Sequence, residues 1–408
     1  KGKKFKEALV LAKNLTNRFP KDANVVNVIG AISMRLGKHE DAIIYFKNAL
    51  KLNANYAEAY NNLGIALNNS DRHEEAIASY KKAIEIKPDY AEAHHNLGNK
   101  NREIGQLSTA IKNYTQALAI NPNYVDAHNN IAVVLQELGQ HNEAMSHFKV
   151  ALEFNACNAN VLNNLGITLS FFGRYDEAIA SYKKAIEIKS DYTEAHSNLG
   201  NLLHKIGNTD AALQSYMKLL TIDSANKLFW AGFAEFLHTV RFKSFNDKLF
   251  PFLEEALNQS SVGPTNISGA IASILKIHPL IQSVMEAAKA DDFDQRINQI
   301  VSRLTDIPLL LQLMELAPIP DSDMERLLRL VRKISLKKLL YGEIEYTNLP
   351  FYSALALHCF TNEYVYLETF EENSGVSRLE EKIEEALKSG EFISPVWIAL
   401  LGCYRPLH

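Results

Sequence analysis

Residues 75–99 read EAIASYKKAIEIKPDYAEAHHNLGN, and residues 177–201 read EAIASYKKAIEIKSDYTEAHSNLGN. The two stretches differ at only three positions, and their offset of 102 residues is three times 34. Self-similarity at a fixed period of a few tens of residues is typical of proteins in which each structural repeat packs on its neighbours. The period therefore indicates the architecture before any single motif does.

One register places six full repeats along the chain, beginning at residues 23, 57, 91, 125, 159 and 193. The eighth position is always small: Gly30, Gly64, Gly98, Ala132, Gly166 and Gly200. The twentieth position is always alanine: Ala42, Ala76, Ala110, Ala144, Ala178 and Ala212. The twenty-fourth position is always aromatic: Phe46, Tyr80, Tyr114, Phe148, Tyr182 and Tyr216. Small residues allow two paired helices to approach closely, and the aromatic ring is expected to fill the wedge towards the next repeat.

These markers at a period of 34 residues resemble the tetratricopeptide-repeat (TPR) family. The resemblance implies an all-α fold, a right-handed superhelix of stacked helix pairs whose first helices line the inner surface. Residues 1–22 are expected to be the second helix of a repeat that begins before residue 1, and residues 23–226 the six full repeats. Residues 227–258 keep part of the pattern and are predicted to form a degenerate capping repeat. Residues 259–408 lack the period and are predicted to form a separate helical domain or connector.

Three polar columns run along the predicted first helices of repeats 2 to 6. Position six is asparagine in all five: Asn62, Asn96, Asn130, Asn164 and Asn198. Position five is also polar: Asn61, His95, Asn129, Asn163 and Ser197. Position two is acidic in four of the five repeats, with Asn160 as the exception: Glu58, Glu92, Asp126 and Glu194. These columns are the candidate binding site.

A column of carboxamides suits recognition of an extended polypeptide, because each offers two N–H donors and an oxygen acceptor to main-chain groups. The arrangement resembles the asparagine ladder of O-linked N-acetylglucosamine transferases, which grips extended polypeptides. Two alternatives stay open: another mode of protein binding, or a mainly structural role for a residue type common at this position. The acidic column favours a partner with basic segments, although acids in a first helical turn also suit the helix dipole.

Composition narrows the function classes further. With a net charge of −4, the chain has no electrostatic reason to bind nucleic acid or membranes non-specifically. It contains no apolar run of the roughly 18 residues that a membrane span needs. Three widely spaced cysteines argue against a disulfide framework, so a reducing, cytoplasmic location is expected. We find no P-loop, dinucleotide-binding fingerprint or GxSxG motif, and we expect neither enzymatic activity nor a cofactor.

The last 150 residues hold weaker signals. Capping boxes are predicted at Ser322–Glu325 and at Ser377–Glu380, each opening a helix. The helix after Ser322 is basic and amphipathic, and we expect it to pack by its leucines with its charges outward. His358 and Cys359 are neighbours on one helix and therefore point in different directions, so no metal site is expected.

Two short motifs in this region, ALHCFTNEYVY at 356–366 followed by a Glu pair, and the ending CYRPLH at 403–408, carry a further resemblance. They are similar to the connector between TPR arrays and S-adenosylmethionine-dependent methyltransferase domains in bacterial multidomain proteins. That resemblance implies that the chain is the substrate-recruiting part of a larger protein.

Together these observations predict a non-catalytic scaffold that holds an extended polypeptide along its asparagine column. The alternatives are a non-catalytic fragment of a TPR-containing transferase (a methyltransferase or glycosyltransferase) and a self-assembling structural scaffold. The partner's identity and the oligomeric state are not determined by the sequence. Changing Asn96, Asn130 and Asn164 together to alanine is expected to leave the fold intact and to weaken binding.

Overall fold

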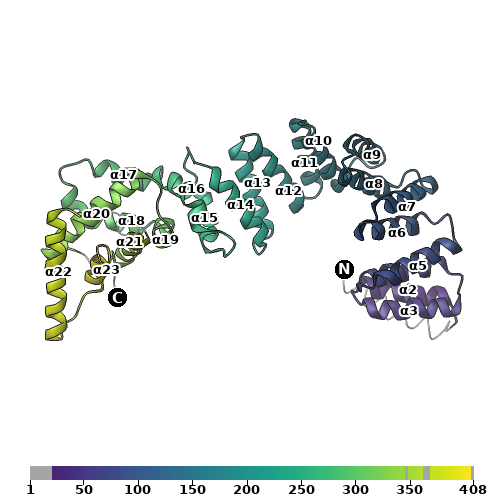
Figure 1. Cartoon of the computed structure of the whole chain (residues 1–408), viewed down its shortest axis with the longest axis horizontal. Coiled ribbons are helices and arrows are strands. Elements are labelled where there is room, and N and C mark those ends of the chain that lie inside the picture. The colour runs from purple at the N-terminus through teal and green to yellow at the C-terminus, as the bar shows by residue number, and fades with distance from the viewer. Residues whose placement is uncertain (1–20, 345–347, 362–367, 406–408) are drawn as a thin grey trace. The chain divides into compact units, whose positions relative to one another are not determined.

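The computed structural model describes residues 21–344, 348–361 and 368–405 (Figure 1). The chain divides into two compact units: the N-terminal unit, Lys1–Asn198, and the C-terminal unit, Leu199–His408. Helices and their connections make up all the described ranges, and no β-strand occurs in them. The predicted all-α class is confirmed. The predicted half repeat at residues 1–22 lies almost wholly outside the described residues.

The N-terminal unit consists of stacked helix pairs, and its helices begin where the register places them. The first helices of the repeats are α2 (Ala23–Arg35), α4 (Ala57–Asn68), α6 (Ala91–Glu103), α8 (Val125–Glu137) and α10 (Ala159–Phe171). The second helices are α3 (His39–Leu52), α5 (His73–Ile86), α7 (Leu107–Ile120), α9 (His141–Phe154) and α11 (Tyr175–Ile188). Each of these first helices starts at position one of its repeat, so the 34-residue register is confirmed. The boundary between the two units falls within α12 (Thr193–Lys205).

Close packing inside each pair follows from the small residue at position eight. A Cβ atom built on Gly98 would lie 2.6 Å from Cε1 of Tyr114, the aromatic residue at position twenty-four of the same repeat. On Gly30 it would lie 2.5 Å from Cε1 of Phe46. These rings therefore occupy the space that a larger side chain would need. Tyr114 also shares a buried apolar cluster with Ile131 of the next repeat, as the wedge argument predicts.

A tight turn joins the two helices of each pair. Gly173, at position fifteen, has a φ of 73°, a left-handed conformation that glycine adopts without steric cost. In repeat 2 the same position is Asp71, which adopts a φ of 57°. Aspartate is one of the few other residue types that tolerate this region. Repeat 2 therefore keeps the turn although it lacks the glycine.

The C-terminal unit begins with helices that still follow the repeat and continues with irregular ones. Its helices are α13 (Thr209–Ile222), α14 (Lys227–Thr239), α15 (Phe250–Asn258), α16 (Pro264–Lys276), α17 (Pro279–Ala287), α18 (Ile297–Thr305), α19 (Pro308–Leu316), α20 (Ser322–Leu340), α21 (Leu349–Thr361), α22 (Phe370–Ser389) and α23 (Pro395–Gly402). Two short 3₁₀ helices, Asp247–Leu249 and Phe293–Arg296, lie between them. The unit boundary at Asn198 reflects compactness, whereas the domain boundary predicted at 258 reflects loss of the repeat, and the latter stays a prediction.

Both capping boxes predicted in this unit are corrected by the structure. Helix α20 does begin at Ser322, but its N-cap is Asp321, whose carboxylate accepts hydrogen bonds from the backbone of Asp323 and Met324. Helix α22 begins seven residues before Ser377, at Phe370, with a capping box formed by Thr369 and Glu372. Ser377 lies inside that helix and donates its hydroxyl hydrogen to the Asn373 carbonyl one turn earlier. A serine followed by a glutamate three residues later also occurs inside helices. In both cases a residue earlier in the chain caps the helix instead, Asp321 for α20 and Thr369 for α22.

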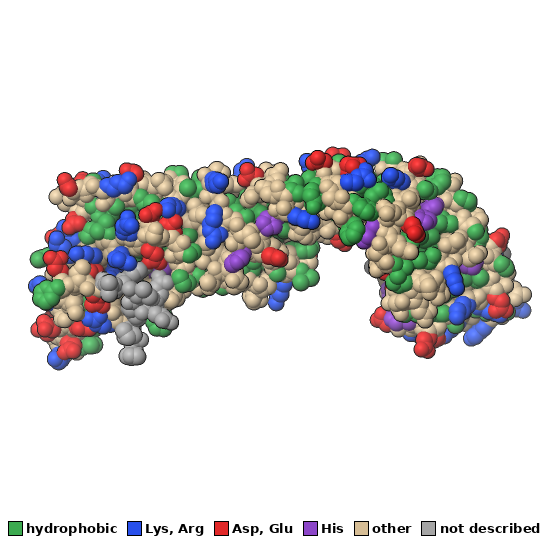
Figure 2. All heavy atoms as spheres, turned by 45° about the horizontal axis from the view of Figure 1, so that its top comes forward, with side chains coloured by type: hydrophobic (Ala, Val, Ile, Leu, Met, Phe, Trp, Pro, Cys, Tyr) green, Lys and Arg blue, Asp and Glu red, His purple; other side chains and the backbone are tan. Residues whose placement is uncertain are grey.

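Figure 2 shows basic and acidic side chains interspersed across the face in view. No single described helix is long and apolar enough to cross a membrane. The bent pair α16 and α17, with 70° between its halves, passes that test of length and composition only when taken together.

Candidate functional site

The candidate site lies on the first helices of the N-terminal unit. Neighbouring first helices contact one another directly: α6 contacts α8, and α8 contacts α10. Positions five and six of successive repeats therefore lie within hydrogen-bonding reach of each other. The three sequence columns become rows of side chains that run across the stack.

The position-six asparagines link each repeat to the one before it. Each donates a side-chain N–H to the position-five side chain of the preceding repeat. The pairs are Asn62 to Asn27 at 3.2 Å, Asn96 to Asn61 at 2.9 Å, Asn130 to His95 at 3.0 Å, Asn164 to Asn129 at 3.0 Å, and Asn198 to Asn163 at 3.0 Å. We call these five bonds the inter-repeat amide row. The row holds the predicted site residues of positions five and six together.

Burial separates the two positions. Asn61 is 0% exposed, and His95 and Asn163 are also buried, so their side chains face the interior between repeats. All five position-six asparagines are half-buried and keep part of their surface exposed. At position five, Asn129 and Ser197 are half-buried as well. In repeats 2, 3 and 5, position six is therefore better placed than position five to meet a ligand.

The inter-repeat bond uses one N–H of each position-six amide, which has two. In Asn130 the second is also engaged, because its Nδ2 lies 2.8 Å from Oδ1 of Asn99. The oxygens of Asn130 and Asn164 accept from the position-five residues beside them, Asn129 at 3.1 Å and Asn163 at 3.4 Å. These bonds orient the amides, so their conformation is set before any ligand arrives.

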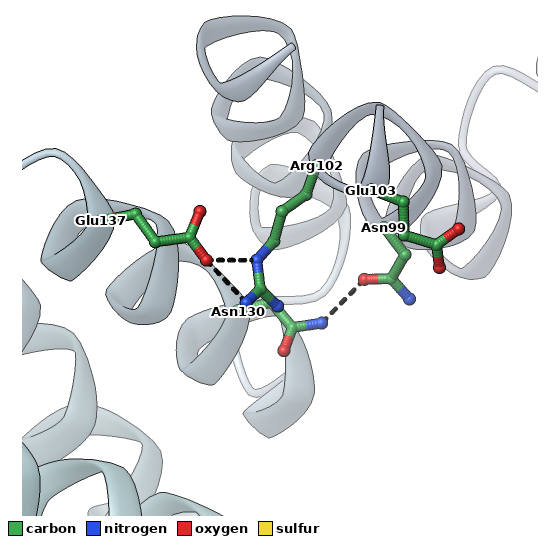
Figure 3. Close-up of a pocket in the computed structure, with 5 residues that line it drawn as sticks. All are labelled: Asn99, Arg102, Glu103, Asn130 and Glu137. Carbon is green, nitrogen blue, oxygen red and sulfur yellow. Dashed lines mark hydrogen bonds and ion pairs between the residues drawn. The ribbon is translucent and has the colours of Figure 1, made fainter. Parts of the chain in front are cut away.

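A polar hollow of about 460 Å³ opens beside Asn130 (Figure 3). Its walls are Asn99, Arg102 and Glu103 of α6 with Asn130 and Glu137 of α8. Arg102 donates to Oε1 of Glu137 from Nε at 2.9 Å and from Nη2 at 2.7 Å. Both side chains of this pair are more than one-third exposed, so the pair contributes little to stability and is open to exchange with a ligand.

The acidic column stands at the start of the first helices. Glu58, Glu92 and Asp126 lie in the first turns of α4, α6 and α8, where a carboxylate also suits the helix dipole. Glu92 and Asp126 are exposed, whereas Glu58 pairs with Lys87 at 3.6 Å. Of these three acids, Glu92 and Asp126 are therefore available to a charged partner.

Sequence reasoning missed several residues of this surface. Asn27 is the first member of the inter-repeat amide row, although position six of its own repeat is Val28. Asn99 and Arg102 were also overlooked, because position nine is asparagine only in repeats 3 and 6, and position twelve differs in every repeat. Their partners are found only when α6 and α8 are placed side by side.

The C-terminal unit holds a buried polar cluster, also missed. Arg332 on α20 is 1% exposed, although the charges of that helix were expected to face outward. Its guanidinium lies 3.3 Å from Glu372 and stacks over the Tyr404 ring at 4.2 Å from the centroid. Burial by itself would raise the pKa of the Glu372 carboxyl, but hydrogen bonds from Thr369 and the charge of Arg332 outweigh it and lower that pKa. The cluster connects α20 with α22 and with the residues after α23, and we interpret it as a contact that stabilises the packing of these helices.

No group of three or more His, Cys, Asp or Glu side chains suited to holding a metal ion occurs in the described ranges. His358 lies 3.0 Å from Glu325 and is wholly buried. Residues 362–366 of the first predicted connector motif and 406–408 of the second lie outside the described residues.

Comparison with known families identifies the repeats. A sequence model described as "TPR repeat" matches residues 30–71, 66–101, 98–139 and 173–207. Three further models of the tetratricopeptide repeat match residues 126–155, 147–180 and 193–226. Residues 30–226 are therefore TPR repeats, as the marker residues predict.

Solved structures agree with this fold. The Cut9–Hcn1 hetero-tetramer of APC/C aligns with a TM-score of 0.52 at 18% identity, over 57% of this chain and 46% of that one. MamA aligns at 28% identity, over 40% of this chain and 95% of its own, with a TM-score of 0.36. YrrB, described as a TPR protein with an unusual peptide-binding site, aligns at 25% identity, over 45% and 95%, with a TM-score of 0.37. A search of curated proteins finds no match. Of these three alignments, the one with Cut9–Hcn1 reaches a TM-score of 0.5, and at 18% identity it shows the fold alone.

Proposed function

We propose that the N-terminal unit is a scaffold that binds an extended polypeptide along its first helices, with the position-six asparagines contacting the main chain of the ligand. The observation that carries this proposal is the inter-repeat amide row: five half-exposed carboxamides, each oriented by a bond to the preceding repeat. A row of amides held in one conformation loses little entropy on binding, which favours affinity.

Recognition of main chain by such a row is expected to depend weakly on ligand sequence. Amide oxygens and N–H groups pair with the N–H and C=O groups that every peptide unit carries. Of the five amides, Asn130 has the fewest donors available to a ligand, because both of its N–H groups already donate to protein side chains. We therefore assign the main-chain contacts chiefly to Asn62, Asn96, Asn164 and Asn198.

Preference among peptides is assigned to charge. Glu92 and Asp126 are exposed at the start of α6 and α8, on the helices that carry the amide row. Carboxylates placed there attract lysine and arginine side chains from a basic segment of the partner. We therefore propose that the amides bind the main chain of the peptide and that the acids give a preference for basic sequences.

The wider role follows from resemblance only. The similarity of residues 356–366 and 403–408 to a methyltransferase connector supports a chain that recruits substrates for a transferase in a larger protein. Self-assembly of the scaffold is the competing outcome, and it is distinguished by measuring the molar mass of the free chain in solution by light scattering.

The test uses a peptide array followed by affinity measurements in solution. Each of the best-binding peptides is compared with a scrambled version and with a version in which alternate backbone nitrogens are methylated. N-methylation removes ligand N–H groups without altering the protein, so it tests main-chain reading with the amide row intact. We expect scrambling to be tolerated, N-methylation to abolish binding, and the Glu92→Gln/Asp126→Asn variant to lose preference for basic peptides. Binding that survives N-methylation but not scrambling would refute the proposal.

A further inference from the structure

Two histidines face each other inside repeat 4. His128 on α8 and His147 on α9 bring their Nδ1 atoms to 3.0 Å, with ring centroids 5.3 Å apart. Both side chains are half-buried in the seam between the paired helices. The pair takes no part in the amide row or in the proposed peptide contacts.

The outer nitrogen of one ring is fixed by the backbone. Nε2 of His128 lies 3.1 Å from the Pro122 carbonyl oxygen, and because a carbonyl only accepts, Nε2 must carry the hydrogen. In the neutral ring this leaves the Nδ1 lone pair facing His147. A histidine whose other N–H donates to a backbone carbonyl is the usual arrangement for a metal ligand, because that bond sets the tautomer and the ring orientation.

The distance between the two nitrogens is compatible with one ion bound by both. With metal–nitrogen bonds of about 2.0–2.1 Å, two ligands at 90° stand about 2.9 Å apart, and two at the tetrahedral angle about 3.3 Å apart. The separation of 3.0 Å is that of the hydrogen bond between the rings, and it lies between these two values, so a small side-chain shift reaches either angle. Among the late divalent ions, affinity for nitrogen ligands generally peaks at Cu²⁺, and imidazole suits Cu²⁺, Ni²⁺ and Zn²⁺.

We propose that His128 and His147 form a two-histidine site for a late divalent transition metal ion, Cu²⁺, Ni²⁺ or Zn²⁺, with water completing the coordination. Without the ion, Nδ1–H of His147 donates to Nδ1 of His128. On binding, His147 gives up its Nδ1 hydrogen to solvent and takes one on Nε2, so the ring stays neutral and its Nδ1 lone pair faces the ion. The ion then links the first helix of repeat 4 to the second.

A negative charge beside the pair favours a bound cation. Glu143 stands one turn earlier on the same helix, and its negative charge favours a cation beside His147.

Other repeats supply matched controls. His94 and His196 occupy the same fourth position as His128, and their Nε2 atoms lie 3.1 Å from the carbonyls of Pro88 and Ser190. The residue equivalent to His147, at position twenty-three, is not histidine in the other repeats from the second onward: Ser79, Asn113, Ser181 and Ser215. Repeat 4 therefore differs from repeats 3 and 6 by one imidazole.

The experiment is a calorimetric titration of the metal-stripped chain with NiCl₂, CuCl₂ and ZnCl₂ at neutral pH. In the wild type we expect saturable binding with Cu²⁺ the tightest of the three ions, and we expect His147→Ser to weaken Ni²⁺ binding about tenfold or more. Serine stands at this position in three other repeats, so the fold should be retained, and circular dichroism checks it. His94→Ser should change nothing, because no histidine faces His94.

A gain-of-site variant keeps the test decisive if His147→Ser fails to fold. Nδ1 of His94 is buried without a hydrogen-bond partner among the described residues. Asn113 stands at the position equivalent to His147, so Asn113→His should place a second imidazole opposite His94 and add a second equivalent of bound Ni²⁺. Saturable binding unchanged by His147→Ser, no saturable binding in the wild type, or no added equivalent in Asn113→His would overturn the proposal.

Discussion

Replacing Asn96 by alanine removes one bond of the inter-repeat amide row and tests whether that row stabilises the stack. Asn96 donates to Oδ1 of Asn61 at 2.9 Å, and the Asn61 side chain is 0% exposed. Water cannot easily replace the lost donor there, so the acceptor is left buried without that partner. The variant should therefore be less stable than the wild type while keeping its fold.

The magnitude follows from that burial. Leaving a buried acceptor unpaired costs about 1–3 kcal/mol. Alanine regains up to about 0.7 kcal/mol in helix propensity at the same position. The net loss should be about 1–2 kcal/mol. Asn164→Ala should cost less, because the acceptor it leaves, Asn129, is only half-buried, and the second bond of Asn164, accepted from buried Asn163, is long at 3.4 Å.

The assay is urea unfolding followed by circular dichroism, with identical conditions for all variants. Asn160→Ala is the matched control: it lies on a first helix of the same unit, is exposed, and should shift the free energy of unfolding by no more than about 0.5 kcal/mol. The expected order of destabilisation is Asn96→Ala, then Asn164→Ala, then Asn160→Ala. Equal stability of Asn96→Ala and Asn160→Ala would show that the row carries no stabilising energy and would refute the reasoning.

Two other changes test the packing and the buried charges. Gly98→Ala should destabilise the chain by about 1–3 kcal/mol in urea unfolding, because the new Cβ meets the Tyr114 ring. Gly200→Ala, where the nearest atom is 3.4 Å away, should be neutral or stabilising by up to about 1 kcal/mol, and equal losses in both would contradict the packing account. Glu372→Gln should cost about 3 kcal/mol at neutral pH by leaving Arg332 buried without its counter-charge. Because the folded pKa of Glu372 is lowered, its contribution is present above the unfolded pKa of about 4.3 and is lost as pH falls through the folded pKa. The difference in free energy of unfolding between wild type and Glu372→Gln should therefore shrink as the pH falls below about 4.3. A difference that stays constant from pH 7 to pH 3 would argue against the ion pair.

The inter-repeat amide row changes how binding experiments on this chain are designed. A triple alanine variant at Asn96, Asn130 and Asn164 removes three bonds between repeats as well as three candidate ligand contacts. Weaker binding by that variant would not separate a lost contact from a loosened stack. Modifying the ligand backbone separates the two, because the protein stays intact.

The repeat itself could be predicted in detail from sequence. The 34-residue period, the small residue at position eight and the aromatic residue at position twenty-four are each local, and each returns six times. Their agreement placed the starts of α4, α6 and α8 at the first residue of each repeat. Repetition makes this possible, because chance coincidences do not recur at one spacing.

Partners across repeats were decided only by the tertiary structure. Sequence identified Asn96 and Asn61 as polar members of two columns, but which atom accepts from which depends on how one helix pair lies on the next. The same holds for His128 and His147, nineteen residues apart on facing helices, and for Arg332, whose amphipathic helix alone predicted an outward charge. A helix period states which face a side chain is on, whereas the partner on that face comes from another part of the chain. For this protein the sequence therefore determined the architecture and the candidate surface, and the packing of one repeat on another determined what each polar side chain does there.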